Sequence, residues 1–173
     1  MAKKKGRFTS RTKARRRAAE ILFEADQKGF ADNSSALLDL LRERQSVTAA
    51  PSELPPYATE IVEGVARNLR PIDRQLTARA KGAGLDRVPA VDRAIMRVAV
   101  WEMMDNTDDV PPIVAIDEAV ALAKALSTAD SPAYVNAVLD AIRVDLEGSQ
   151  PAKATPVAEE VDAEIPEEFL DEY

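Results

Sequence analysis

The chain has 173 residues and contains neither cysteine nor histidine, which excludes disulfides and thiol chemistry and removes the commonest general base and zinc ligand. Its formal net charge is -7, yet nine of its 23 basic residues and none of its 30 acidic residues lie in the first 17 positions, so one end attracts polyanions. The most apolar stretch is too short to span a bilayer and no signal peptide is apparent, so we expect a soluble cytoplasmic protein.

Apolar residues that recur every three or four positions predict three helices in the first part of the chain. The first begins at Thr9 or Ser10, either of which can act as N-cap, and ends near Gly29. The second covers residues 33–45, and the third covers residues 57–69 after a proline-rich connection. The inward-facing residues predicted for the first helix are Ala14, Ala18, Ile21, Leu22 and Ala25.

Four more helices are predicted in the remainder of the chain. Pro71 should open the fourth, because proline is tolerated best at the first helical position. The fifth covers residues 90–104, the sixth starts at the pair of prolines at Pro111, and the last follows Pro132. In the sixth helix, Ile113 is predicted to point inward with the other apolar residues. No segment alternates with a period of two for long enough to predict a strand, so we expect an all-α fold of about seven helices.

The sequence divides into three parts by composition. Residues 1–8 predict a flexible basic arm, and residues 9–146 predict an all-helical domain. Residues 147–173 contain nine acidic residues and one lysine, which predicts a disordered acidic tail. A solvated tail is the simplest interpretation, and a short binding motif is the alternative, formed by its apolar residues Ile165, Phe169, Leu170 and Tyr173.

No sequence pattern predicts catalysis. The chain has no glycine-rich phosphate loop, no cysteine or histidine nucleophile system and no cluster with metal-ligand spacing. Asp117 and Glu118 are adjacent near a predicted helix start, where solvated carboxylates complement the helix dipole. We therefore expect a protein that is not an enzyme and that has no cofactor and no metal site.

The basic segment predicts a nucleic-acid site on the first helix. Arg11 and Arg15 are four positions apart and are predicted to share a face other than the buried one, flanked by Arg16. Arginine forks to phosphate and stacks on exposed bases, which suits single-stranded RNA. Phosphate contacts carry no sequence information. Phe23 and Tyr134 are candidates for stacking with bases, although composition alone favours the core for both.

Three blocks of sequence occur in one order between residues 8 and 145. They read RTKAR followed by AAEILF, then VDRAIMRVAVWEM, and finally VPPIVAIDEAVALAK followed by DSPAYVNAVLD. In this order the blocks resemble the NusB family of bacterial transcription antitermination factors. The resemblance implies a seven-helix fold made of two small bundles, and it does not extend to the acidic tail.

The resemblance also implies partners and site residues. It implies binding of single-stranded boxA RNA from nascent ribosomal RNA transcripts, together with the ribosomal protein NusE, in an antitermination complex on RNA polymerase. The RNA-binding residues expected from the resemblance and from the neighbouring cations are Lys5, Arg7, Arg11, Lys13, Arg15, Arg16, Phe23, Asp130 and Tyr134. Phe23 and Asp92 are expected on the partner side. Asp130 either accepts hydrogen bonds from base edges or only caps the last helix.

Two other functions remain open at this stage. One is an RNA-positioning domain of an RNA cytosine methyltransferase, although the sequence contains no cofactor-binding region. The other is a regulatory homodimer that masks its basic helix. The excess of acidic residues outside the basic segment suits a basic partner such as a ribosomal protein.

Overall fold

The computed structural model describes residues 9–46, 53–80 and 84–149. These residues form seven α-helices and one short 3₁₀ helix, with no strand among them, which confirms the predicted all-α fold. The elements are α1 (Ser10–Gln27), α2 (Ser34–Ser46), α3 (Pro56–Arg67), α4 (Leu69–Arg79), η1 (Leu85–Arg87), α5 (Ala90–Asp105), α6 (Pro112–Leu126) and α7 (Ser131–Ser149). The predicted arm at 1–8 and residues 150–173 of the predicted tail lie outside the described residues.

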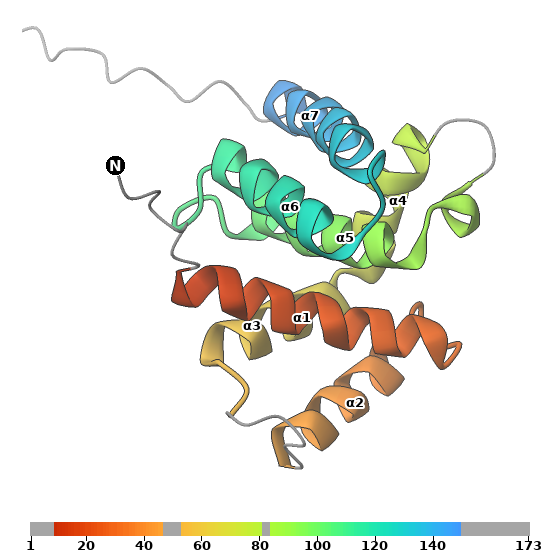
Figure 1. Ribbon diagram of the computed structural model, residues 1–173, viewed down its shortest axis with the longest axis vertical. Coiled ribbons are helices and arrows are strands. Elements are labelled where there is room, and N and C mark those ends of the chain that lie inside the picture. The colour runs from red at the N-terminus through yellow and green to blue at the C-terminus, as the bar shows by residue number, and fades with distance from the viewer. Residues whose placement is uncertain (1–8, 47–52, 81–83, 150–173) are drawn as a thin grey trace, which may run out of the picture.

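The helices form two bundles that share one core. Helices α1, α2 and α3 pack on one another, and α4, α6 and α7 pack around α5 (Figure 1). Helices α1 and α3 also pack on α5, so the two bundles meet along these three helices. The buried apolar residues consequently form one continuous cluster from α1 to α7. None of the helices in the described ranges combines the length and the apolarity needed to cross a membrane.

Three helix limits differ from the prediction. Helix α4 begins at Leu69, and Pro71 occupies its third position instead of its first. The N–H groups of a first helical turn have no intrahelical acceptor, so proline there removes no hydrogen bond. Helix α3 accordingly ends at Arg67, two residues before the predicted limit. Helix α7 continues through Glu147 to Ser149, so the helical domain extends past the boundary predicted at 147.

The buried face of α6 also differs from the prediction. Ile113 is 62% exposed, so the expectation that it points inward is wrong. Ala115 and Leu122 are buried instead and complete the inward face with Ile116. A period of 3.6 residues sets the spacing of buried positions, but it leaves the centre of the buried face uncertain by about one position.

A glycine brings α3 close to α5. A Cβ atom built on Gly64 would lie 2.0 Å from Nε1 of Trp101, which is far inside van der Waals contact. Trp101 is 6% exposed and belongs to the core. The absence of a side chain at position 64 therefore lets the indole of α5 pack against the α3 backbone.

Candidate nucleic-acid interface

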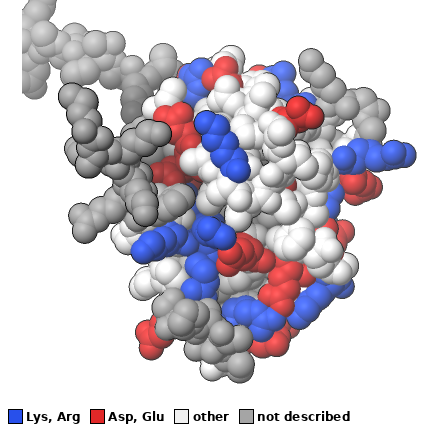
Figure 2. Space-filling view, in the orientation of Figure 1, with Lys and Arg blue, Asp and Glu red and all other residues white. Residues whose placement is uncertain are grey.

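Helix α1 carries the predicted basic site and begins at a defined cap. The backbone N–H of Thr12 donates to the Thr9 hydroxyl at 3.1 Å, which is the N-cap bond expected from the sequence. Lys13 and Arg16 are exposed on the outer side of the helix. Figure 2 shows basic side chains over the first part of α1 and a mixture of basic and acidic ones farther along.

Arg15 does not lie on this exposed face. It is 3% exposed, so the prediction of a solvent-facing arginine is wrong. Its Nε donates to Glu102 Oε1 at 2.8 Å and its Nη2 donates to Glu102 Oε2 at 2.9 Å. This two-point geometry is the strongest form of ion pair between these side chains, and it directs the guanidinium into the protein.

The pair of Arg15 and Glu102 belongs to a polar cluster between the bundles. The Tyr57 hydroxyl of α3 donates to Glu102 Oε2 at 2.7 Å. Glu118 of α6 lies 3.7 Å from Nη1 of Arg15 and accepts from the Thr12 hydroxyl at 2.9 Å. We call Thr12, Arg15, Tyr57, Glu102 and Glu118 the inter-bundle cluster. It connects α1, α3, α5 and α6, and each charge in it has a partner of opposite sign.

Electrostatics favour the charged form of Arg15 and the neutral form of Tyr57 in this cluster. Burial opposes the charge on Arg15, but the hydrogen bonds and negative charge of Glu102 outweigh it, so the pKa of Arg15 lies above its ordinary value. Burial, followed by the hydrogen bond to Glu102, raises the pKa of Tyr57. The hydroxyl of Tyr57 therefore remains a donor to Glu102 throughout the physiological pH range.

Arg11 covers the outer side of the same cluster. Its guanidinium carbon lies 4.6 Å from the centre of the Tyr57 ring, a cation–π distance. Its Nη2 is 3.6 Å from Asp109 Oδ2, and both of these side chains are about half exposed. Arg11 is thus accessible to solvent but held near α3, on a different side of α1 from Lys13 and Arg16.

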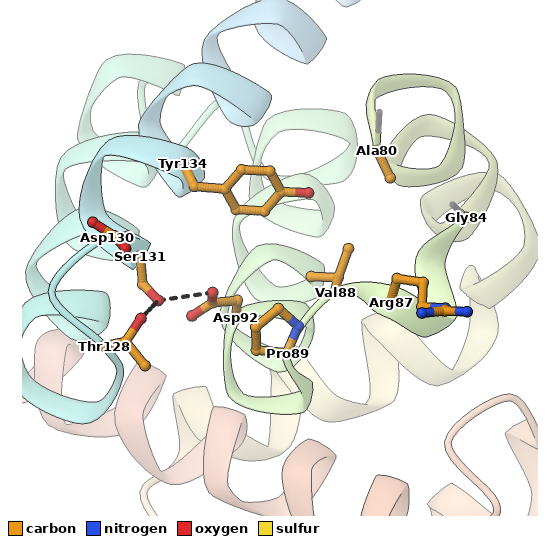
Figure 3. A pocket seen from close by; sticks show the side chains of 10 residues that line it. All are labelled: Ala80, Gly84, Arg87, Val88, Pro89, Asp92, Thr128, Asp130, Ser131 and Tyr134. Carbon is orange, nitrogen blue, oxygen red and sulfur yellow. Dashed lines mark hydrogen bonds between the residues drawn. The ribbon is translucent and has the colours of Figure 1, made fainter. Parts of the chain in front are cut away.

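A pocket of about 370 Å³ lies where α5 and α7 begin. Tyr134 extends over it, and Val88 and Pro89 lie on the opposite side (Figure 3). Asp92 lines the pocket and is 2% exposed. Its Oδ2 accepts from the Ser131 hydroxyl at 2.9 Å, whereas its Oδ1 has no hydrogen-bond partner among the described residues.

The structure places the predicted partner residue Asp92 inside the protein instead of on its surface. Its carboxylate and the Ser131 hydroxyl join the start of α5 to the start of α7 (Figure 3). Burial, followed by the negative charge of Asp92, raises the pKa of Tyr134. Asp92 is therefore buried but borders an open pocket, and its place on the partner side stays a prediction.

Asp130 and Tyr134 lie at the same corner but in different environments. Tyr134 is half-buried and points across the pocket, whereas Asp130 is exposed and points away from its centre (Figure 3). At this turn the hydroxyls of Ser127 and Thr128 each hydrogen-bond to the Ser131 hydroxyl. This arrangement leaves the Asp130 carboxylate open to solvent.

Phe23 lies between the basic start of α1 and this pocket. It is half-buried and lines a groove of about 150 Å³ with Val91 of α5 and Leu126 of α6. Arg93, which follows the pocket residue Asp92 in α5, donates to Asp26 near the end of α1 at 2.6 Å. The start of α5 is thereby held beside the end of α1. The exposed cations and the Phe23 groove therefore follow one another along α1, and the Tyr134 pocket lies at the starts of α5 and α7.

The sequence contained a signal for the burial of Arg15 that the prediction missed. Arg15 precedes the buried residues Ala18, Ala19 and Leu22 by three, four and seven positions, which places it on the inward face. Its partners carried no such signal. Tyr57 and Glu102 are 42 and 87 positions away along the chain, and only the packing of α3 and α5 brings them to it.

Of the remaining predicted residues, Lys5 and Arg7 lie outside the described residues.

The comparisons with known proteins agree with the fold and with the order of the sequence blocks. The family model described as the NusB family matches residues 12–143. The transcription antitermination protein NusB of Beutenbergia cavernae is 51% identical over 135 residues, which cover 76% of this chain and 88% of that protein.

Other relatives give the same result. The transcription antitermination protein NusB of Saccharopolyspora erythraea is 45% identical over 82% of this chain and 97% of its own length. The structure of T. maritima NusB superposes with a TM-score of 0.60 at 28% identity, over 79% of this chain and 92% of that one. A chain in a crystal structure of a plectonemic RNA supercoil superposes with a TM-score of 0.63 at 26% identity, over 81% and 98%. From its sequence and its fold, the chain belongs to the NusB family.

Proposed function

We propose that this protein is a transcription antitermination factor that binds single-stranded boxA RNA of nascent ribosomal RNA transcripts. The relatives that it matches are named transcription antitermination proteins, and a structural neighbour comes from a crystal structure of RNA. The part of its geometry that carries the proposal is the track that begins with exposed cations and a half-buried phenylalanine on α1 and continues to the tyrosine-covered pocket at the starts of α5 and α7.

Each part of this track suits a different part of an RNA strand. Lys13 and Arg16 present ammonium and guanidinium groups to phosphates, which provides affinity without sequence preference. Tyr134 offers an aromatic face above a pocket, and stacking on such a face contributes about 1–3 kcal/mol per base. Asp130 is exposed beside it and is able to accept hydrogen bonds from amino groups of bases.

The ribosomal protein NusE is the partner that we propose for the same complex on RNA polymerase. The Phe23 groove is lined mainly by apolar side chains, as expected of a site that receives a partner's side chain. Outside the basic segment the chain is strongly acidic, which complements a basic ribosomal protein. A cytoplasmic location follows from this role. No feature of the described residues favours the methyltransferase alternative.

Arg15 has a positioning role in this proposal. Its guanidinium is engaged by Glu102 inside the protein, so it holds α1 in place and leaves phosphate binding to the outer cations. Replacing Arg15 would therefore disturb the fold as well as the site. A test of RNA binding has to separate these two effects.

The test is fluorescence anisotropy with a boxA-containing RNA and a scrambled RNA, at about 50 and 200 mM salt. We expect Lys13→Ala/Arg16→Ala to weaken boxA binding and to lower the salt slope by about 1.4, because each phosphate contact to a single strand contributes about 0.7. The matched control is Arg42→Ala/Arg74→Ala, which removes the same charge from exposed positions on α2 and α4.

Two further variants address specificity and assembly. Tyr134→Ala should reduce the preference for boxA over scrambled RNA while the salt slope stays unchanged. Equal affinity of the wild type for both RNAs, alone and with NusE present, would contradict the proposed function. Light scattering with and without RNA tests the homodimer alternative. A dimer that masks the basic helix should dissociate when RNA is saturating, and a dimer that persists with saturating RNA would contradict masking.

A further inference from the structure

The two charged ends of the chain leave the folded domain on the same side. Helix α1 begins at Ser10 and α7 ends at Ser149, and the start of α6 lies between them (Figure 1). The segment before α6 lies next to both ends: Asp109 pairs with Arg11 of α1, and its neighbour Asp108 lines one pocket together with Glu147 of α7. Ser149, which residues 150–173 follow in the sequence, therefore lies on the side of the domain where α1 begins.

The sequence before and within the first part of α1 and the sequence after α7 have opposite charge. Residues 150–173 contain eight acidic residues and one lysine, whereas residues 1–17 contain nine basic residues and no acidic one. Lys13 has no ion pair within the described part of the chain. Among the described residues, Arg16 pairs only with Glu20, one turn away, and both of these side chains are about half exposed. Such exposed pairs contribute little, so this basic face is accessible to another anion.

The acidic segment is long enough to cover this face. Twenty-four residues extend to at most about 80 Å, and the 18 residues of α1 span about 27 Å. A segment tethered in this way has an effective concentration in the millimolar range. At such a concentration, an attraction between the segment and the basic face that is too weak to join separate molecules is enough to keep the face occupied for part of the time.

We propose that the acidic segment 150–173 docks on the basic face of α1, defined by Lys13 and Arg16, and competes there with RNA. The inference rests on the proposed function for its competitor, but the docking itself does not require RNA. Occupancy is governed by charge and decreases with salt, because both interactions release counterions.

The test uses the full-length chain with all eight acidic residues of 150–173 replaced by their amides, Asp→Asn and Glu→Gln. We expect this neutralised variant to bind boxA RNA about three- to tenfold more tightly than wild type at about 50 mM salt, and less than about twofold more tightly at 300 mM. The control variant Ile165→Ser/Phe169→Ser/Leu170→Ser/Tyr173→Ser keeps the charge and should behave like wild type.

A second readout without RNA separates failure of this inference from failure of the proposed function. The backbone amide signals of Lys13 and Arg16 in NMR spectra should differ between wild type and the neutralised variant at low salt, and should converge at high salt. Identical spectra and identical RNA affinities would overturn the inference. A spectral difference that depends on protein concentration would also overturn it, because the occupant would then be a second copy. So would a spectral difference that the control variant abolishes and the neutralised variant does not.

Discussion

Helix α5 carries two buried carboxylates whose environments differ sharply. Glu102 is fully buried, and its two oxygens accept hydrogen bonds from Arg15 and Tyr57. Asp92, near the other end of the helix, is 2% exposed. It accepts one side-chain hydrogen bond, from Ser131, and its Oδ1 has no partner among the described residues. The same helix therefore presents one fully satisfied carboxylate and one partly satisfied carboxylate.

The difference distinguishes a structural site from a binding site. A buried charge with all its partners in place holds the surrounding helices in one arrangement, and removing one partner is costly. A buried oxygen without a partner costs free energy in the folded state. It is retained beside an open pocket, where a bound group is able to offset that cost. Glu102 is of the first kind, and for Asp92 we propose the second.

The largest expected effect is on the inter-bundle cluster. Glu102→Leu leaves the Arg15 guanidinium buried without its main partner, so we expect the free energy of unfolding to fall by about 3–5 kcal/mol. Urea unfolding measures this change. The double variant Arg15→Met/Glu102→Leu removes both charges and should recover most of the loss. A double variant as unstable as Glu102→Leu would show that the ion pair does not account for the effect.

A smaller effect is expected where α3 approaches α5, next to Glu102. Gly64→Ala places a methyl group 2.0 Å from the Trp101 indole, and such overpacking costs about 1–3 kcal/mol. Gly148→Ala is the matched control, since no atom lies within 4 Å of a Cβ there. It should raise the free energy of unfolding by up to about 1 kcal/mol. Equal thermal shifts for the two variants would mean that α3 and α5 are less tightly packed than the structure indicates.

Asp92, whose carboxylate has one oxygen without a partner among the described residues, should respond to substitution differently from Glu102. Asp92→Asn retains an acceptor for the Ser131 hydroxyl and removes a buried charge, so we expect stability to change by less than about 1 kcal/mol. RNA binding should change more than stability, because the residue lines the Tyr134 pocket. Unfolding and anisotropy on the same samples compare the two effects. A loss of stability as large as that of Glu102→Leu would place Asp92 among the structural residues.

The smallest expected effect is a dependence on alkaline pH. The pKa of Tyr57 is raised in the folded state by burial and by Glu102, whereas the unfolded residue titrates near its ordinary value of 10.0. The folded state therefore holds this proton more tightly, so the stabilisation is present below pH 10 and is lost as the pH rises above it. Unfolding free energies from pH 8 to 11 should fall more steeply for wild type than for Tyr57→Phe; parallel curves would contradict this.

Particular residues show how far the sequence predicted the site. Lys13 and Arg16 were predicted to be exposed cations and are exposed, and Tyr134 was identified from the family resemblance and covers a pocket. Arg15 was expected at the surface and is buried, and Asp92, expected on the partner side, is buried beside the Tyr134 pocket. Glu118 was expected to be a solvated carboxylate, but it belongs to the inter-bundle cluster. The roles of these residues in RNA or partner binding remain predictions.

The sequence by itself determined the helices and the family, because a period of 3.6 residues, caps and prolines act over short distances. The distribution of charge between the two ends was equally evident from it. Only the tertiary structure decided which charged residues are buried. A charge is stable inside a protein when groups of opposite charge surround it, and for Arg15 those groups come from α5 and α6, far away along the chain. Their arrangement depends on how the two bundles pack.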